Sequence, residues 1–261
     1  MARSAINYNS EKMHSLVRLN HYISKTGILS RRKADDAIKE GKVSVNGEVV
    51  FEPYYKVKGG DKVKISNKIL ELKRPVYILL NKPKGITTTL SDRFAHKKVI
   101  DLIPKEILSS EGGVVKTKGV YPVGRLDKDS SGLLILTNDG DLCYRVTHPK
   151  FSVEKEYLVR LKGMLSDKDC RLAIKGVWDG QDYLKIRSIK ILDTKAKETL
   201  CKVIISEGKK RHLRRLFKKL GFIVSDLIRV RIGELKLHNL ELGKFQVIKK
   251  SYIYKKLSLP L

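Results

Sequence analysis

The stretch YPVGRLDKDSSGLLILTNDG, residues 121–140, decides how the rest of the chain is interpreted. It places one carboxylate, Asp127, in a polar turn near glycines, and the apolar run 133–136 that follows predicts a buried strand. The turn at 138–140 ends that strand. A loop held by a buried strand can expose a reactive side chain and still fix its position. DKDSSG is also an ordinary turn composition, so this composition alone does not mark a site.

The longer pattern G-R-L-D-x-x-[ST]-x-G-L-L-x-x-[ST]-x-[DN]-G resembles the catalytic loop of RNA pseudouridine synthases of the RsuA/RluB family. The positions that match it are Gly124, Arg125, Leu126, Asp127, Ser130, Gly132, Leu133, Leu134, Thr137, Asp139 and Gly140. Ser130 stands where Thr is more usual, and it keeps the hydroxyl group. The resemblance implies that Asp127 is catalytic and that Arg125 contacts the RNA.

Charge and length limit the possible functions. The 261 residues allow a small domain and a larger one with its own core. The formal net charge is +27, and the basic excess is 8 in residues 1–75 and 19 in the remainder. A positive charge spread over the whole chain favours a polyanionic partner, nucleic acid above all. An anionic membrane surface is the lesser alternative, because the chain shows no lipidation signal.

Other composition features concern compartment and cofactors. No apolar run approaches the length of a membrane span, and the N-terminus has no signal-peptide segment. Cys143, Cys170 and Cys201 are far apart, which argues against a zinc site or a disulfide framework and predicts a cytoplasmic location. With neither metal-ligand spacing nor a glycine-rich phosphate loop, no metal or cofactor is expected. A monomer is expected.

Residues 16–66 predict a small helix–helix–sheet domain that follows a tail over residues 1–15. Helical spacing covers 17–26, and Ser30 is a candidate N-cap for a second helix over 31–40. Asn46-Gly47 predicts a type I′ hairpin, and residues 61–65 alternate like a further strand.

The stretch RLNHYISKTGILSRRKADDAIKEGKVSVNG resembles the S4-type RNA-binding domain. Three cations begin its second helix, where backbone N–H groups already favour phosphate. A solvated helix end is the alternative interpretation of these charges. On the resemblance, RNA recognition through shape and phosphates is expected. The RNA-binding candidates in this domain are Arg18, Arg31, Arg32 and Lys33.

A linker over 67–75 is expected to lead into a second domain over 76–250, with a tail over 251–261. Strand patterns at 76–80, 133–136, 153–159 and 227–237 alternate with helix candidates at 99–107, 142–147, 167–174 and after Gly208. The predicted fold class is α+β, with a mixed, mainly antiparallel sheet and helices flanking a central cleft. Trp178 is expected in the core, and His148 is expected to bond within a loop, although a general base is conceivable.

Two short motifs of the second domain resemble further family motifs. Lys82-Pro83-Lys84-Gly85 resembles a loop that flanks the catalytic cleft, and both lysines are candidates for RNA contact; a simple hairpin turn is the alternative. Lys155-x-Tyr157 lies in a predicted strand and resembles the family's second motif. The resemblance implies that Tyr157 covers the substrate base and that Lys155 contacts RNA.

The stretch EGKKRHLRRLFKKLG, residues 207–221, predicts a helix with one apolar face and many cations. It resembles E-G-x-N-R-x-[VL]-R-R-[LM]-F-x-x-x-G, with Lys210 where Asn is usual and His212 where Gln or Glu is usual. Arg214 lies at the border of the apolar face. On the resemblance it is the first candidate for the basic partner of Asp127, and Lys209 and Arg211 are the second choices, also expected to contact RNA.

The stretch LIRVRIG resembles a family motif in which an apolar residue forms the floor of the base pocket, and Ile232 is the candidate. The resemblance as a whole implies isomerisation of a flipped-out uridine in ribosomal RNA, with the large-subunit branch favoured and the small-subunit branch open. The alternative is a non-catalytic RNA-binding or ribosome-assembly factor. A methyltransferase would need a glycine-rich cofactor loop after a first strand, which the chain does not offer.

Overall fold

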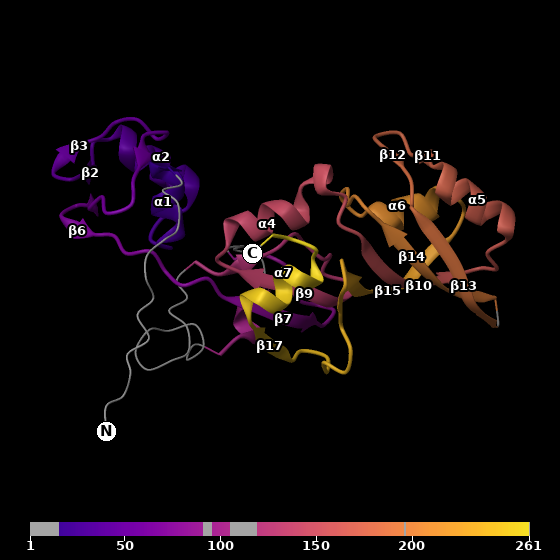
Figure 1. Cartoon of the computed structure of the whole chain (residues 1–261). Coiled ribbons are helices and arrows are strands. Elements are labelled where there is room, and N and C mark those ends of the chain that lie inside the picture. Colours follow the sequence, from indigo (N-terminus) through magenta and orange to yellow (C-terminus); the bar gives the residue numbers. More distant parts are fainter. Residues whose placement is uncertain (1–15, 91–95, 105–118, 196, 261) are drawn as a thin grey trace, which may run out of the picture. The chain divides into compact units, whose positions relative to one another are not determined.

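A computed structural model describes residues 16–90, 96–104, 119–195 and 197–260 (Figure 1). The chain divides into two compact units, Met1–Lys73 and Arg74–Leu261. The tail expected over residues 1–15 lies outside the described residues. Within the described residues, no helix combines the length and the apolar character needed to cross a membrane.

Unit 1 is the expected helix–helix–sheet domain. Ser30 caps the second helix by accepting a hydrogen bond from the Lys33 N–H, and Asn46 and Gly47 both take positive φ angles in the two-residue hairpin turn. Both local predictions are therefore confirmed. The elements are β1 (Val17–Arg18), α1 (Leu19–Lys25), α2 (Arg31–Lys39), β2 (Val43–Val45), β3 (Glu48–Val49), β4 (Lys56–Val57), β5 (Val63–Ile65) and β6 (Lys68–Ile69).

The linker expected over 67–75 begins too early. Strand β6 pairs with β5 in the small sheet, and Leu70 is buried in the core of unit 1. Leu70 also donates a backbone hydrogen bond to Val63. These residues belong to the first domain because they bury an apolar side chain and complete a ladder, which a polar, lysine-rich sequence did not indicate.

Unit 2 is built on one twisted sheet. Within the described residues nine strands form it, in the order β13-β14-β10-β15-β9-β7-β17, with β16 beside β15 and β8 beside β9. Only the β15–β9 pair is parallel among these strands, so the sheet is mainly antiparallel, as predicted. The elements are β7 (Tyr77–Lys82), η1 (Val99–Leu102), β8 (Tyr121–Pro122), β9 (Ser131–Thr137), α4 (Gly140–Thr147), η2 (Pro149–Phe151), β10 (Lys155–Lys162), α5 (Asp167–Lys175), β11 (Val177–Trp178), β12 (Tyr183–Leu184), β13 (Ser188–Lys195), β14 (Glu198–Ile205), α6 (His212–Lys219), β15 (Ile223–Ile232), β16 (Leu235–Lys236), β17 (Phe245–Ile248) and α7 (Lys250–Lys256).

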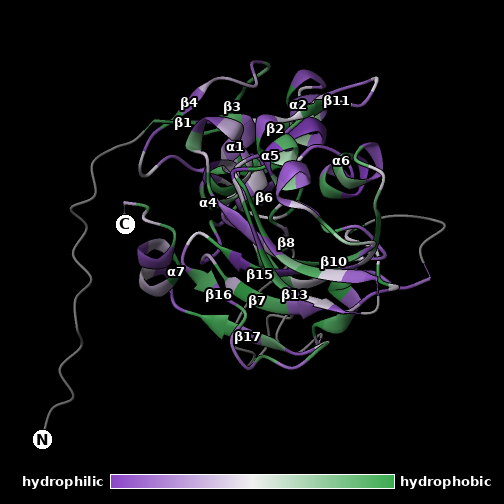
Figure 2. Ribbon diagram, turned by 90° about the vertical axis from the view of Figure 1, so that its right-hand side faces the viewer, coloured by the Kyte–Doolittle hydropathy of each residue, from purple (hydrophilic) through white to green (hydrophobic). Residues whose placement is uncertain are grey.

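The two central strands β7 and β9 are buried on both faces. In β9, Leu134 and Leu136 join the core cluster that contains α5 and α6, whereas Leu133 and Ile135 join the cluster that contains α4 and α7. A strand that is covered on both faces needs apolar side chains at successive positions, which explains the unbroken LLIL run of residues 133–136. The strand β7 is correspondingly hydrophobic in Figure 2, and helix α6 shows both polar and apolar colours.

Gly132 is required where β9 meets β15. A Cβ atom at this position would lie 2.2 Å from the carbonyl oxygen of Arg229, and the glycine has a φ of +107°. Any other residue would therefore force the strands apart. This close approach fixes the start of β9, directly after the turn that carries Asp127.

Three expectations for unit 2 are wrong or only partly tested. The expected tail over 251–261 contains most of helix α7, whose Ile253 and Tyr254 are buried against the β7–β9 side of the sheet. Trp178 is 59% exposed, so it is not a core residue. The helix expected over 99–107 is a single 3-10 turn, η1, in its described part.

Replacing Ile253 with Ala should lower the unfolding free energy of the chain by about 2–4 kcal/mol, because the side chain is fully buried. Tyr252→Ala, on the exposed side of the same helix, should change it by less than about 0.5 kcal/mol. Urea unfolding followed by far-UV circular dichroism measures both. Equal stability of the two variants would show that α7 does not contribute to the core.

Candidate active site

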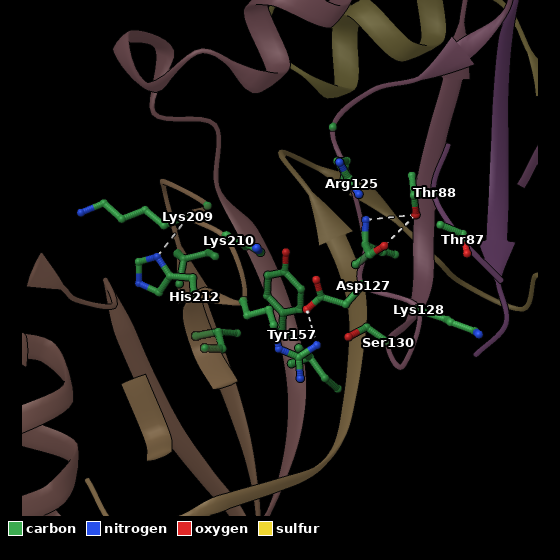
Figure 3. A pocket seen from close by; sticks show the side chains of 17 residues that line it. Thr87, Thr88, Arg125, Asp127, Lys128, Ser130, Tyr157, Lys209, Lys210 and His212 are labelled. Carbon is green, nitrogen blue, oxygen red and sulfur yellow. Dashed lines mark hydrogen bonds and ion pairs between the residues drawn. The ribbon is translucent and has the colours of Figure 1, made fainter. Parts of the chain in front are cut away.

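A cavity of about 740 Å³ lies where the turn after β8, strand β10 and the start of α6 meet. This volume is typical of small-molecule sites. Figure 3 shows Asp127 beside Tyr157, with Arg125 and Thr88 on one side and Lys209 and His212 on the other. The lining residues are Thr87, Thr88, Gly124, Arg125, Leu126, Asp127, Lys128, Ser130, Tyr157, Ile205, Gly208, Lys209, Lys210, Arg211, His212, Leu213 and Leu227.

The turn that carries Asp127 is held by the segment after β7. The Thr88 hydroxyl donates to the Leu126 carbonyl at 2.7 Å and accepts from the Leu126 N–H at 3.3 Å. The Gly85 N–H donates to the Lys128 carbonyl at 2.7 Å. The KPKG motif thus supports the turn that carries Asp127, and the simple hairpin interpretation is insufficient.

Lys82 lies beneath the same turn and is fully buried. Its Nζ donates to the carbonyls of Asp127 at 3.0 Å, Ser130 at 2.7 Å and Pro83 at 3.1 Å. Burial lowers the pKa of Lys82 to about 8, although the nearby carboxylates of Asp127 and Asp129 oppose the shift. The expectation that Lys82 contacts RNA is wrong in this structure, because its ammonium group is enclosed by carbonyls of the turn.

Arg211 reaches into the cavity from the start of α6. It is the N-cap residue of this helix and takes the left-handed conformation, with φ at 51°. Its guanidinium lies 3.9 Å from the Asp127 carboxylate and donates to both Asp129 oxygens, at 3.3 and 3.2 Å. Among the residues that the structure describes, Arg211 is therefore the cation within ion-pair distance of Asp127.

Arg214 binds the far side of the turn instead. It donates to the Asp129 carbonyl at 2.9 Å and the Ser130 hydroxyl at 3.4 Å, and it lies 3.2 Å from the Asp129 carboxylate. Burial disfavours ionised Asp129, but the Arg211 hydrogen bonds and the Arg214 charge outweigh it, so the pKa of Asp129 lies below its usual value. The role of Arg214 as the basic partner of Asp127 stays a prediction; its guanidinium contacts Asp129, Ser130 and the Val224 carbonyl.

The apolar part of the cavity comes from three different elements. Ile205 ends β14, Leu213 lies in α6 and Leu227 lies in β15. Ile232 does not line the cavity and is buried in the other core cluster, beside α7. The expectation that Ile232 forms the pocket floor is therefore wrong.

The other cations predicted from the sequence have different surroundings. Lys84 is exposed and pairs with Asp226 at 2.7 Å. Lys155 is half-buried and donates to the Val153 carbonyl, and burial, with the Arg229 charge, lowers its pKa to about 8. In unit 1 the cations of the second helix and the residue before α1 are exposed; these are Arg18, Arg31, Arg32 and Lys33.

His212 forms the first turn of α6 and is nine-tenths buried. Its Nδ1 accepts from the Lys209 N–H at 3.4 Å, and its Nε2 lies 3.0 Å from the Lys185 carbonyl. Both contacts require the neutral ring with the proton on Nε2. Burial lowers the pKa of His212 accordingly. The residue that departs from the family pattern thus fixes the loop that carries Lys209 and Arg211.

Several cavity residues were missed in the sequence. Lys128 and Lys210 add two exposed cations to the lining, and Thr88 holds the turn. Asp129 does not line the cavity, but it pairs with Arg211 and Arg214 and so helps to hold the turn. The only sequence signal for Lys128 and Asp129 was their place within the matched loop. Thr88 and Lys210 come from segments about 40 and 80 residues away, so only the tertiary structure brings them together with Asp127.

Two family models match the chain. The RNA pseudouridylate synthase model covers residues 76–219, and the S4 domain model covers residues 17–63. The first match includes more than half of the chain and every segment of the cavity except Leu227. The chain belongs to the RNA pseudouridine synthase family and is an enzyme of the RsuA/RluB type.

Relatives of known name span most of the chain. It is 37% identical over 231 residues to the ribosomal large subunit pseudouridine synthase B of Bacillus subtilis (strain 168), a match that covers 87% of this chain and 89% of the relative. An uncharacterized RNA pseudouridine synthase of Aquifex aeolicus (strain VF5) is 35% identical, with 88% and 92% covered. A crystal structure described as that of pseudouridylate synthase matches with a TM-score of 0.64 at 27% identity and covers 92% of this chain and 99% of its own.

The protonation of His212 should make stability depend on pH. Because its pKa in the folded state lies below the reference value of 6.5, the unfolded chain takes up a proton first as pH falls below 6.5. The His212 contribution is therefore complete above pH 6.5 and is lost on acidification. His212→Gln, which can make the same two hydrogen bonds, should flatten the fall in unfolding free energy between about pH 7 and about pH 5. Denaturant unfolding across this range measures it, and identical slopes for both proteins would contradict the account.

Proposed function

We propose that the chain isomerises a specific uridine of ribosomal RNA to pseudouridine, with Asp127 acting on a nucleotide that has left the base stack. The observation that carries this proposal is the arrangement of one cavity around Asp127. The carboxylate has a guanidinium, Arg211, at 3.9 Å and shares the cavity with the Tyr157 ring. The cavity is large enough for a nucleoside, with apolar and cationic walls.

The chemistry requires few groups. The N1–C1′ bond of uridine breaks, the base rotates, and C5 joins C1′, with one proton lost from C5 and one gained at N1. An ionised carboxylate near the sugar can attack C1′ or remove a proton from C2′, and Arg211 lies close enough to orient it. Tyr157 can cover the base, which must leave the stack at a cost of a few kcal/mol. No redox change occurs, so the proposal needs no cofactor.

Ribosomal RNA is proposed as the substrate on two grounds. The Bacillus subtilis relative is named for the large ribosomal subunit, and this chain covers most of its length. The basic excess extends over both units, as a polyanion partner requires. We therefore propose a large-subunit uridine, with a monomeric protein acting in the cytoplasm, where its three free thiols would stay reduced.

Asp127→Asn should abolish pseudouridine formation, at least about 1,000-fold, because the amide is neither a nucleophile nor a base. RNA affinity should change little, since the carboxylate adds no attraction for phosphate. Chemical mapping of pseudouridine in ribosomal RNA from cells with the wild-type protein, the variant or no protein measures the loss and identifies the uridine. Asp193→Asn, on β13 outside the cavity, is the matched control.

A normal pseudouridine map in the Asp127→Asn cells would reject the role of this carboxylate. Identical maps with and without the wild-type protein would instead favour the alternative, a binding or ribosome-assembly factor without catalytic function in the cell.

Removing residues 1–73 should weaken RNA binding and flatten its salt dependence, because the exposed cations of the S4 domain release counterions from the RNA. Unit 2 has its own two core clusters, so its circular dichroism should keep a cooperative thermal transition. A salt titration of RNA affinity compares the truncated and full chains. Unchanged affinity and slope would argue against unit 1 as an RNA anchor.

A further inference from the structure

An exposed group of rings lies where helix α4 passes into the turn η2. We name it the aromatic patch and define it as Tyr144, His148, Lys150 and Phe151. Tyr144 is 47% exposed, His148 and Lys150 are exposed, and Phe151 is half-buried. The buried face of α4 is formed by Leu142 and Val146 instead. The rings are therefore not needed to seal the core beneath this helix.

The rings of the patch support one another. The Tyr144 ring lies 4.9 Å from His148 and 5.5 Å from Phe151, the latter edge to face, and His148 lies 6.4 Å from Phe151. The Lys150 ammonium lies 4.9 Å from the Tyr144 ring centre and 4.8 Å from that of Phe151. His148 also accepts a hydrogen bond from the Lys150 N–H, as expected for a residue in a loop. The patch is thus a preorganised aromatic surface with a cation at its face.

The composition of the patch fits a nucleotide. A ring face stacks any nucleobase, and a lysine beside it can pair with the neighbouring phosphate. Among the described residues, no carboxylate forms an ion pair with Lys150. A second cation, Arg145, lies 5.8 Å from the Phe151 ring. The net charge of +27 favours RNA over a basic or neutral protein partner at this surface.

The patch is connected to the active-site cavity on both sides. The second half of α4 packs on Gly124, where a Cβ atom would lie 3.5 Å from Thr147. Gly124 and Arg125 line the cavity. After η2 the chain enters β10, which carries Tyr157 into the same cavity. The patch is thus joined to two of the segments that line the cavity, one by contact and one along the chain.

We propose that the aromatic patch is a stacking subsite, in which Tyr144 takes a nucleobase of the RNA close to the extruded uridine and Lys150 takes the adjoining phosphate. The inference rests on the proposed function for the identity of the RNA. It adds a contact that holds an unpaired neighbour of the target, so the enzyme would favour uridines in loops or bulges over those in regular helices.

The test compares two substitutions of Tyr144 with one control substitution of Tyr252 on α7. Tyr144→Leu should weaken RNA affinity about tenfold, within the range for loss of one stacked base. Tyr144→Phe should restore wild-type affinity, because stacking uses the ring and not the hydroxyl. Tyr252→Leu, an equally exposed tyrosine on α7, should leave affinity unchanged. The probe is a short unmodified transcript spanning the mapped uridine or, where none is mapped, the full-length large-subunit ribosomal RNA transcript.

The outcomes are separable from those of the proposed function. Wild-type affinity of Tyr144→Leu, or an equal loss in Tyr252→Leu, would overturn the subsite even if pseudouridine forms normally. A loss of RNA affinity in both Tyr144→Leu and Tyr144→Phe would also overturn the subsite, because this result would show a role for the hydroxyl or for folding. Failure of the wild-type protein to form pseudouridine would reject the proposed function and leave the affinity comparison to decide the subsite.

The cation provides a second measurement. Lys150→Gln should reduce the slope of log affinity against log salt by about 1, as expected when one phosphate contact is lost. Lys190→Gln, an exposed lysine on β13, is the charge-matched control and should leave the slope unchanged. Equal slopes for Lys150→Gln and the wild type would overturn the phosphate contact.

Discussion

The candidate active site depends on the hydrogen bonds that the buried ammonium group of Lys82 donates to the turn carrying Asp127. This group donates to the carbonyls on both sides of the turn, at Asp127 and Ser130, and so sets the position of the carboxylate from below. Burying a cation without a direct ion pair is costly, which is why its pKa falls to about 8. The cost is offset by charge-assisted hydrogen bonds and by the field of Asp127 and Asp129. A loop held this firmly can present a charged side chain with little loss of conformational entropy on binding.

The site is assembled from segments that are distant in the chain. The Thr88 segment, the Asp127 turn, the Tyr157 strand and the start of α6 at Arg211 meet only because β9 lies between β7 and β15. The contact of Gly132 with Arg229 is too close for any side chain, and it joins β9 directly to β15. The fold and the assembly of the site therefore share one requirement, the correct pairing of β9 with β15.

Local patterns predicted the local structures well. The LLIL run predicted β9, Ser30 predicted the N-cap of α2, and Asn46-Gly47 predicted the hairpin turn. These predictions hold because each local structure depends mainly on residues that are close in the sequence. The fold class and the family followed from long motifs. Which residues line the cavity was only partly predictable: Asp127 and Tyr157 lie there, and Ile232 does not.

The errors share a cause. A lysine in a turn is expected to be exposed, yet Lys82 is enclosed by a segment about 45 residues further along the chain. The sequence of α7 predicts a tail, yet the Tyr254 hydroxyl of this helix donates a hydrogen bond to Asp139. Arg214 lies at the border of its helix as predicted, and it contacts Asp129, Ser130 and Val224, so its pairing with Asp127 stays a prediction. Side-chain partners across long loops depend on packing that periodicity does not encode.

The most direct test of the account is a crystal structure of the Asp127→Asn protein bound to its RNA. The account predicts a uridine out of the stack, with its ribose at residue 127 and its base against Tyr157. A uridine still paired within the RNA helix, or a nucleoside held elsewhere on the protein, would contradict it.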